Sequence, residues 1–151
     1  MTSRLRRYAQ WLSATPFHPQ WLMPKRNVGN NVRKCRGTVL DIGCADGRLK
    51  SCLDPKAVHI GLDYPVTAIL LYRTRPHVFG DASNLPFSDG CVDVVACYEV
   101  LEHVCDLVQS VTEIARVLKP GGYAEFSMPF LYLIHDLLAS SNSHDQYFYH
   151  Q

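Results

Sequence analysis

The chain has 151 residues, of which 47% are hydrophobic and 19% charged, and its formal net charge is +1. This composition is typical of one globular domain and excludes a disordered chain, which would be poor in large apolar residues. No apolar run approaches the roughly 18 residues that a membrane-spanning helix needs, so no transmembrane segment is predicted. No clean apolar run follows the basic N-terminus, so a secretory signal is not expected.

Six cysteines are spread through the chain, without a Cys-x-x-Cys pair or a Cys/His spacing typical of a zinc site. Cys91 and Cys97 stand inside apolar runs, where a thiol packs as a small hydrophobic side chain. We therefore expect reduced cysteines, no disulfide framework and a cytoplasmic location.

The charges are unevenly distributed along the chain. Residues 1–40 carry eight basic side chains and no acidic one, whereas the remainder carries seven basic and all 14 acidic side chains. A basic arm of this kind suits phosphate groups or an acidic surface; the alternative is that it lies against the acidic remainder of the chain. Residues 1–36 are predicted to form a basic helix and loop, as a lid or an arm, with a polar linker over 25–36. The main domain is predicted over residues 37–151.

The main domain is predicted to alternate strands with helices. Apolar, β-rich runs predict five strands, over residues 38–42, 58–63, 77–80, 91–97 and 123–128. Helical spacing predicts three helices, over about 46–53, from Pro65 onward, and over 107–118. Pro-Gly-Gly at 120–122 is expected to end the last helix in a turn. Because strands that alternate with helices form right-handed βαβ units, we predict an α/β fold with a doubly wound, mostly parallel sheet.

Acidic residues stand at the predicted strand ends, where such a sheet binds its ligands. The first three strands end at or near Asp41, Asp63 and Asp81, and Glu99 follows the fourth. A phosphate site would instead need backbone amides with Lys or Arg, so this rim favours a ligand with hydroxyls, an amine and a positive charge.

The spacing of these residues suits a nucleoside. Asp63 lies 20 residues past Gly43, the distance at which a carboxylate binds both hydroxyls of a ribose. Asp81 is placed to accept a hydrogen bond from the exocyclic amine of a purine, and Tyr64 and Leu85 would flank its ring.

Five motifs in order carry a resemblance to a known family. They are residues 39–47 (VLDIGCADG), Asp63, residues 80–90 (GDASNLPFSDG), residues 98–104 (YEVLEHV) and residues 116–122 (RVLKPGG). Over about residues 37–130 they resemble the class I S-adenosylmethionine-dependent methyltransferases, in particular the subgroup acting on small molecules and lipids. The resemblance implies a Rossmann-like sheet of five parallel strands in the order 3-2-1-4-5.

The resemblance also implies a cofactor site for S-adenosylmethionine. Its residues would be Asp41, Gly43, Cys44, Gly47, Asp63, Tyr64, Asp81, Ala82 and Tyr98. The turn at Gly43 would pass the methionine part, with Asp41 beneath it shaping the turn. Asp63 would hold the ribose, Asp81 the adenine, and Tyr98 would lie near the methyl group. Ala45 replaces a glycine of many members, and it also counts against a nicotinamide site, whose Gly-x-Gly-x-x-Gly fingerprint needs glycine there.

The implied reaction is an in-line displacement at the methyl carbon of a sulfonium, so the protein mainly positions and desolvates the reactants. We expect a small-molecule or lipid-like methyl acceptor. One alternative is a cofactor-binding module without catalysis. The other is a nucleic-acid methyltransferase that places residues 1–40 on phosphates, although residues 97–100 (CYEV) differ from the Asn-Pro-Pro-Tyr-like tetrapeptide of base methylation.

Two features leave the interpretation open. Glu99, Glu102 and His103 could bind a divalent cation, as in certain methyltransferases, or could pack and cap locally. Members of this fold usually continue with strands six and seven, whereas only about 22 residues follow Pro129. We therefore expect a domain that is incomplete at the C-terminus, in which the uncovered edge of strand five favours self-association.

Overall fold

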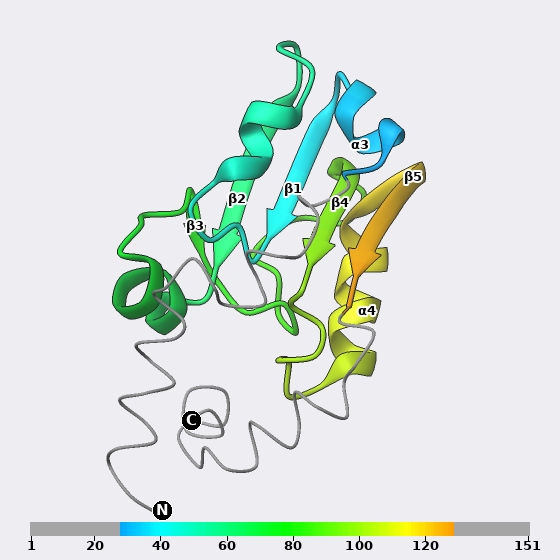
Figure 1. The fold of residues 1–151 in the computed structure, drawn as a ribbon. Helices are drawn as coiled ribbons and strands as arrows, with labels where there is room; N and C mark the ends of the chain where they lie inside the picture. Colours follow the sequence, from blue (N-terminus) through cyan, green and yellow to red (C-terminus); the bar gives the residue numbers. More distant parts are fainter. Residues whose placement is uncertain (1–27, 129–151) are drawn as a thin grey trace, which may run out of the picture.

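A five-stranded, all-parallel sheet forms the centre of the computed structural model, which describes residues 28–128 (Figure 1). Its strands are β1 (Thr38–Ile42), β2 (Val58–Asp63), β3 (Val78–Phe79), β4 (Val92–Tyr98) and β5 (Leu118–Ser127). The strand order is β3-β2-β1-β4-β5, and every neighbouring pair is parallel. The predicted α/β class and the order 3-2-1-4-5 are therefore confirmed.

Both faces of the central strands are buried, as the nearly continuous apolar sequence of the fourth strand predicts for a parallel sheet covered by helices. Leu40 and Ile42 of β1 pack in one core cluster with Ile114 of α4 (Leu107–Val117). The alternate residue Val39 packs on the other face with Val32 of α3 (Asn30–Lys34). Successive β residues point to opposite faces, so β1 joins the two clusters.

The helices differ from prediction more than the strands do. The predicted helix over 46–53 is a short 3₁₀ helix, η1 (Arg48–Cys52), and the segment after Pro65 becomes the π-helical η2 (Thr67–Tyr72). The predicted linker over 25–36 contains α3, because Val28 and Val32, four residues apart, are both buried against the sheet. Among residues 28–128, no helix is long and apolar enough to cross a membrane.

The fifth strand begins at Leu118, five residues earlier than predicted. Val92 pairs with Leu118 while Val94 pairs with Tyr123, so Pro-Gly-Gly at 120–122 forms an irregularity inside the strand. Glycine is favoured at position 122, because a Cβ there would lie only 2.9 Å from the Asp93 carbonyl oxygen. The helix α4 accordingly ends at Val117, before the sequence that was expected to stop it.

Several sequence predictions fall outside the described residues. These are the part of the predicted basic helix and loop that precedes residue 28, and the part of the predicted main domain that follows residue 128.

Candidate functional site

A cavity of about 340 Å³ lies at the carboxyl ends of β1, β2, β3 and β4. Six of the nine predicted cofactor-binding residues line it: Gly43, Asp63, Tyr64, Asp81, Ala82 and Tyr98. They come from segments far apart in the sequence and meet because parallel strands end at the same edge of the sheet.

The other three predicted residues, Asp41, Cys44 and Gly47, do not line the cavity. The buried Asp41 carboxylate lies 3.0 Å from Nε2 of His59, and Cys44 is buried beside Gly61. Gly47 has a left-handed φ of +73° and precedes η1. All three therefore support the turn after β1 from outside the cavity.

Sequence reasoning did not assign the remaining eleven lining residues to the cofactor. They are Ile42, Ala45, Leu62, Thr67, Tyr72, Gly80, Glu99, Val100, His103, Val104 and Cys105. The lining residues between 99 and 105 belong to or follow the motif over residues 98–104, so their proximity to the cofactor site can be predicted from the sequence. Thr67 and Tyr72 reach the cavity only through the position of η2, which the sequence does not reveal.

The turn after β1 is fixed by backbone geometry. The amides of Gly43 and Cys44 both donate to the Leu62 carbonyl oxygen, at 2.8 and 3.1 Å. Gly43 has a φ of +69°, and a Cβ at this position would lie 2.3 Å from Cγ2 of Val100. Only glycine combines this conformation with so close a neighbour, and the bare backbone therefore forms one wall of the cavity. Ala45 follows with a φ of +48°, a conformation that is strained for alanine.

Asp63 is the buried carboxylate of the site, with 3% of its surface exposed. Its Oδ2 accepts from the amide of Ala45 and its Oδ1 from the amide of Tyr64, both at 2.8 Å. Burial raises the pKa of Asp63 above its usual value, and the two amide hydrogen bonds oppose this effect. Each oxygen uses one of its two acceptor directions on the backbone, which leaves a second direction for a ligand hydroxyl.

Asp81 follows β3 and lines the same cavity as Asp63. Its Oδ1 accepts from the amide and the hydroxyl of Ser83, both at 2.8 Å, so its carboxylate is oriented by a local turn. Leu85 was expected to flank a purine ring. Instead it is 3% exposed and does not line the cavity, because its side chain packs in the core cluster that includes Ile114 of α4.

Tyr98 lines the cavity, but its hydroxyl is already engaged. It donates to Oε1 of Glu125 on β5 at 2.7 Å, and the amide of Gly29 donates to the same oxygen at 2.7 Å. Burial, followed by the Glu125 carboxylate, raises the pKa of Tyr98 well above its usual value. The Tyr98 hydroxyl is therefore neutral at physiological pH and fixed toward β5.

A family model described as a methyltransferase domain matches residues 40–126 of the chain, which include every strand of the sheet except the first residues of β1 and the last of β5. The chain belongs to the class I S-adenosylmethionine-dependent methyltransferases.

The chain has relatives among named proteins and solved structures. A probable S-adenosylmethionine-dependent methyltransferase of Mycolicibacterium smegmatis is 39% identical over 104 residues, which make up 65% of this chain and 40% of that protein. A ubiquinone biosynthesis O-methyltransferase of Aromatoleum aromaticum is 30% identical over 124 residues, 74% of this chain and 50% of the relative. The chain therefore spans 40–50% of the length of these two relatives.

The crystal structure of a putative methyltransferase from Bacillus halodurans shares the fold. It superposes with a TM-score of 0.59 at 21% identity, over 76% of this chain and 57% of the solved one.

The cofactor of this methyltransferase family is S-adenosylmethionine, and the chemistry of the cavity fits it. Among the described residues that line the cavity, Asp63, Asp81 and Glu99 carry carboxylates and none is Lys or Arg. Such a lining suits ribose hydroxyls, an adenine amine and a sulfonium charge, and disfavours a phosphate.

Of the three residues considered for a metal ion, Glu99 has a partner of its own, whereas Glu102 and His103 lie near each other. Glu99 is exposed and accepts from the Ser127 hydroxyl at 2.6 Å, whereas the Glu102 side chain is 2% exposed. Nε2 of His103 lies 3.9 Å from Oε1 of Glu102. Within the described part of the chain, no three His, Cys, Asp or Glu side chains are arranged to hold a metal ion.

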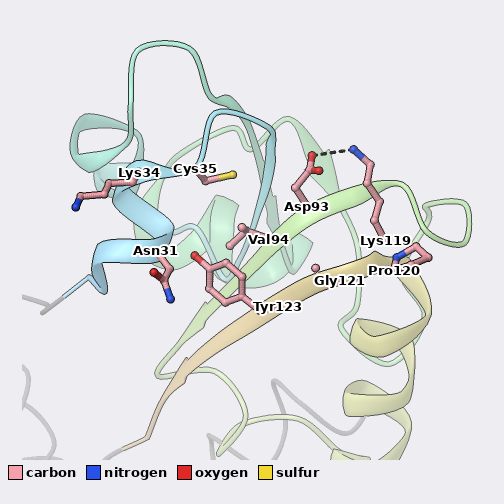
Figure 2. A pocket seen from close by; sticks show the side chains of 10 residues that line it. Asn31, Lys34, Cys35, Asp93, Val94, Lys119, Pro120, Gly121 and Tyr123 are labelled. Carbon is pink, nitrogen blue, oxygen red and sulfur yellow. Dashed lines mark hydrogen bonds and ion pairs between the residues drawn. The ribbon is translucent and has the colours of Figure 1, made fainter.

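A larger cavity of about 490 Å³ lies near the other end of the sheet, between α3 and the first residues of β4 and β5 (Figure 2). Figure 2 shows Asn31 and Tyr123 on one side and the pair of Asp93 with Lys119 on the other. Oδ2 of Asp93 accepts from Nζ of Lys119 and from the amide of Thr38, both at 2.8 Å, and these bonds lower the pKa of Asp93. This carboxylate stabilises the fold. The cavity lies away from the carboxyl ends of the strands, where α/β sheets bind ligands.

Proposed function

We propose that the chain binds S-adenosylmethionine in the strand-end cavity and transfers its methyl group to a small-molecule or lipid-like acceptor. The observation that carries the proposal is the shared cavity of Asp63 and Asp81, with the bare turn at Gly43 beside them. One carboxylate for the ribose and one for the adenine amine thus line a single cavity, as the binding of one adenosine between them requires.

Each cavity residue then has a role that follows from its surroundings. Asp63 accepts from the ribose hydroxyls with the acceptor directions that the amides of Ala45 and Tyr64 leave. Asp81 accepts from the adenine amine, beside the buried Ala82. The Gly43 turn lets the methionine part approach the backbone closely.

The bound cofactor supplies a methyl group on a positively charged sulfur. The apolar part of the lining, with Ile42, Leu62, Val100 and Val104, keeps water from that region. The fixed Tyr98 hydroxyl holds β4 against β5, so the strand end below the cavity stays in place. The chain therefore acts mainly by binding, orienting and desolvating the reactants.

The acceptor is proposed to enter beside Glu99, Val100 and residues 103–105, which form the part of the lining that follows β4. The relative from Aromatoleum aromaticum is named for ubiquinone biosynthesis, and this supports an acceptor with a hydroxyl on an apolar framework. The exposed carboxylate of Glu99 suits a hydroxyl or an amine on that acceptor.

The proposal is tested by incubating the full chain with S-adenosylmethionine that carries an isotopically labelled methyl group. Three acceptor pools are compared: hydroxylated aromatic compounds with and without a lipid tail, RNA, and DNA. Label in the first pool alone supports the proposal. Label in RNA or DNA favours the nucleic-acid alternative, and cofactor binding without label in any pool favours a module without catalysis.

The remaining sequence predictions stay predictions. The N-terminal lid or arm over residues 1–36, the cytoplasmic location and self-association through the edge of β5 all await measurements of their own. Within residues 28–128, β5 pairs with β4 alone, which is the observation on which the self-association proposal rests.

A further inference from the structure

The loop between β3 and β4 forms the adenine side of the proposed cofactor site. It contributes Asp81 and Ala82 to the cavity, yet over residues 80–91 its regular backbone pairing is limited to one isolated bridge between Asp81 and Asn84. Such a loop needs contacts from outside to hold its shape.

Arg116 of α4 supplies most of these contacts. Its Nη1 donates to the carbonyl oxygen of Phe87 at 2.8 Å and to Oδ1 of Asp89 at 2.7 Å. Its Nη2 donates to the carbonyl oxygen of Leu85 at 3.0 Å. The carbonyl oxygen of Arg116 in turn accepts from the amide of Gly90 at 2.9 Å, so one residue holds four positions of the loop.

Glu113, one helical turn earlier and 8% exposed, completes the arrangement. Its Oε2 accepts from the amide of Leu85 at 2.8 Å, the residue that directly follows the Asp81–Asn84 bridge. The same carboxylate accepts from Nε and Nη2 of Arg116, at 2.7 and 2.8 Å. These hydrogen bonds, led by the one from Arg116, hold the pKa of Glu113 below its usual value.

The pair is rigid because a planar guanidinium and a carboxylate meet through two parallel hydrogen bonds. A shift of α4 or of either side chain is therefore transmitted to Leu85 and through the bridge to Asp81. Another charged pair, Lys119 with Asp93, lies against the other cavity, and within residues 28–128 its Asp93 carboxylate accepts from Thr38 of β1 rather than from the loop.

We propose that Glu113 and Arg116 are positioning residues for the adenine side of the cofactor site, and that they set its selectivity for the purine base. Neither side chain lines the cavity, so both act through the loop that carries Asp81. The inference rests on the proposed function, because it assumes that Asp81 accepts from the adenine amine.

The test compares two ligands that differ only at the purine: S-adenosylhomocysteine, and S-inosylhomocysteine, in which an oxygen replaces the exocyclic amine. Calorimetry on the full wild-type chain is expected to favour the adenosyl ligand by at least about tenfold, the usual effect of one hydrogen bond to a charged group. Arg116→Met is expected to reduce this ratio to about twofold. Lys119→Met, which breaks the other charged pair, is the matched control and should keep the wild-type ratio.

Arg116→Lys and Glu113→Gln keep the test decisive if Arg116→Met does not fold. A lysine reaches fewer of the three loop positions that the guanidinium binds, at Leu85, Phe87 and Asp89, so an intermediate ratio is expected for Arg116→Lys. Variants that weaken both ligands equally, with an unchanged ratio, overturn the inference and leave a purely structural role. Failure of the wild-type chain to bind either ligand instead contradicts the proposed function, so the two failures are distinguishable.

Discussion

Replacing Asp63 by asparagine changes the proposed ribose site with almost no change of shape. Both carboxylate oxygens accept a backbone amide at 2.8 Å, from Ala45 and from Tyr64. Asparagine offers one oxygen and one NH₂ group, so one of the two backbone amides must face another donor.

Two effects set the size of the stability change. Loss of a hydrogen bond to a charged group lowers the free energy of unfolding by about 1.5–3 kcal/mol. The raised pKa of Asp63 shows that burial disfavours its ionised form, so removing the charge offsets part of this loss. We therefore expect a decrease of about 1.5 kcal/mol, at the lower end of that range.

The effect on binding is larger, because in Asp63→Asn the ribose hydroxyls of the ligand meet a neutral amide instead of a carboxylate. Losing a charge-assisted interaction worth about 2 kcal/mol weakens S-adenosylhomocysteine binding about 30-fold. Calorimetric titration at pH 7 measures this change directly.

Asp93→Asn is the matched control. Asp93 also accepts a backbone amide, from Thr38 at 2.8 Å, but lies against the other cavity. The Asp93→Asn variant should be less stable than the wild-type chain and bind S-adenosylhomocysteine with the wild-type Kd. A Kd for Asp63→Asn within about threefold of wild type, or an equal weakening in both variants, would refute the ribose assignment.

Three further predictions follow from the same cavity. Because burial holds the pKa of Asp63 above 3.8, acidification through that pKa should protonate it and weaken S-adenosylhomocysteine binding in wild type but not in Asp63→Asn. The folded chain binds this proton more tightly than the unfolded chain, so the same group adds stability as the pH falls in a urea-unfolding series. Gly43→Ala places a Cβ 2.3 Å from Cγ2 of Val100 at a φ of +69°, so we expect the free energy of unfolding to fall by about 2 kcal/mol. Thermal unfolding measures this change, and an unchanged Tm would contradict the turn geometry. Burial raises the pKa of the Cys44 thiol to about 12, so iodoacetamide at pH 8 should label the exposed Cys105 and not Cys44. Because Cys105 lines the cavity, bound S-adenosylhomocysteine should protect it from labelling. Mass spectrometry that finds Cys44 labelled first, or Cys105 unprotected, would argue against this cavity.

The strands could be predicted from the sequence because their signal is local. Val92 to Cys97 is apolar except for Asp93, and a nearly continuous apolar run of this length is typical of a strand in a parallel sheet covered on both faces. The helices could not be predicted as well, because their type depends on packing. The short α3 is stabilised by the burial of Val28 and Val32 against a sheet that the local sequence does not show.

The predicted site residues divide along the same line. Gly43, Asp63 and Asp81 could be placed together because each follows a parallel strand, and such strand ends meet. Leu85 was assigned to the cavity wrongly, because its side chain packs in a core cluster with Ile114 of α4, far along the chain. The partner of the Tyr98 hydroxyl, on β5, was hidden for the same reason.

The most direct test of the central claim is a crystal structure of the full chain with S-adenosylhomocysteine. The account predicts one adenosine in the cavity at the strand ends, with its ribose hydroxyls on Asp63 and its exocyclic amine on Asp81. A ligand bound in the cavity beside Tyr123, or one that touches only one of the two carboxylates, would contradict it.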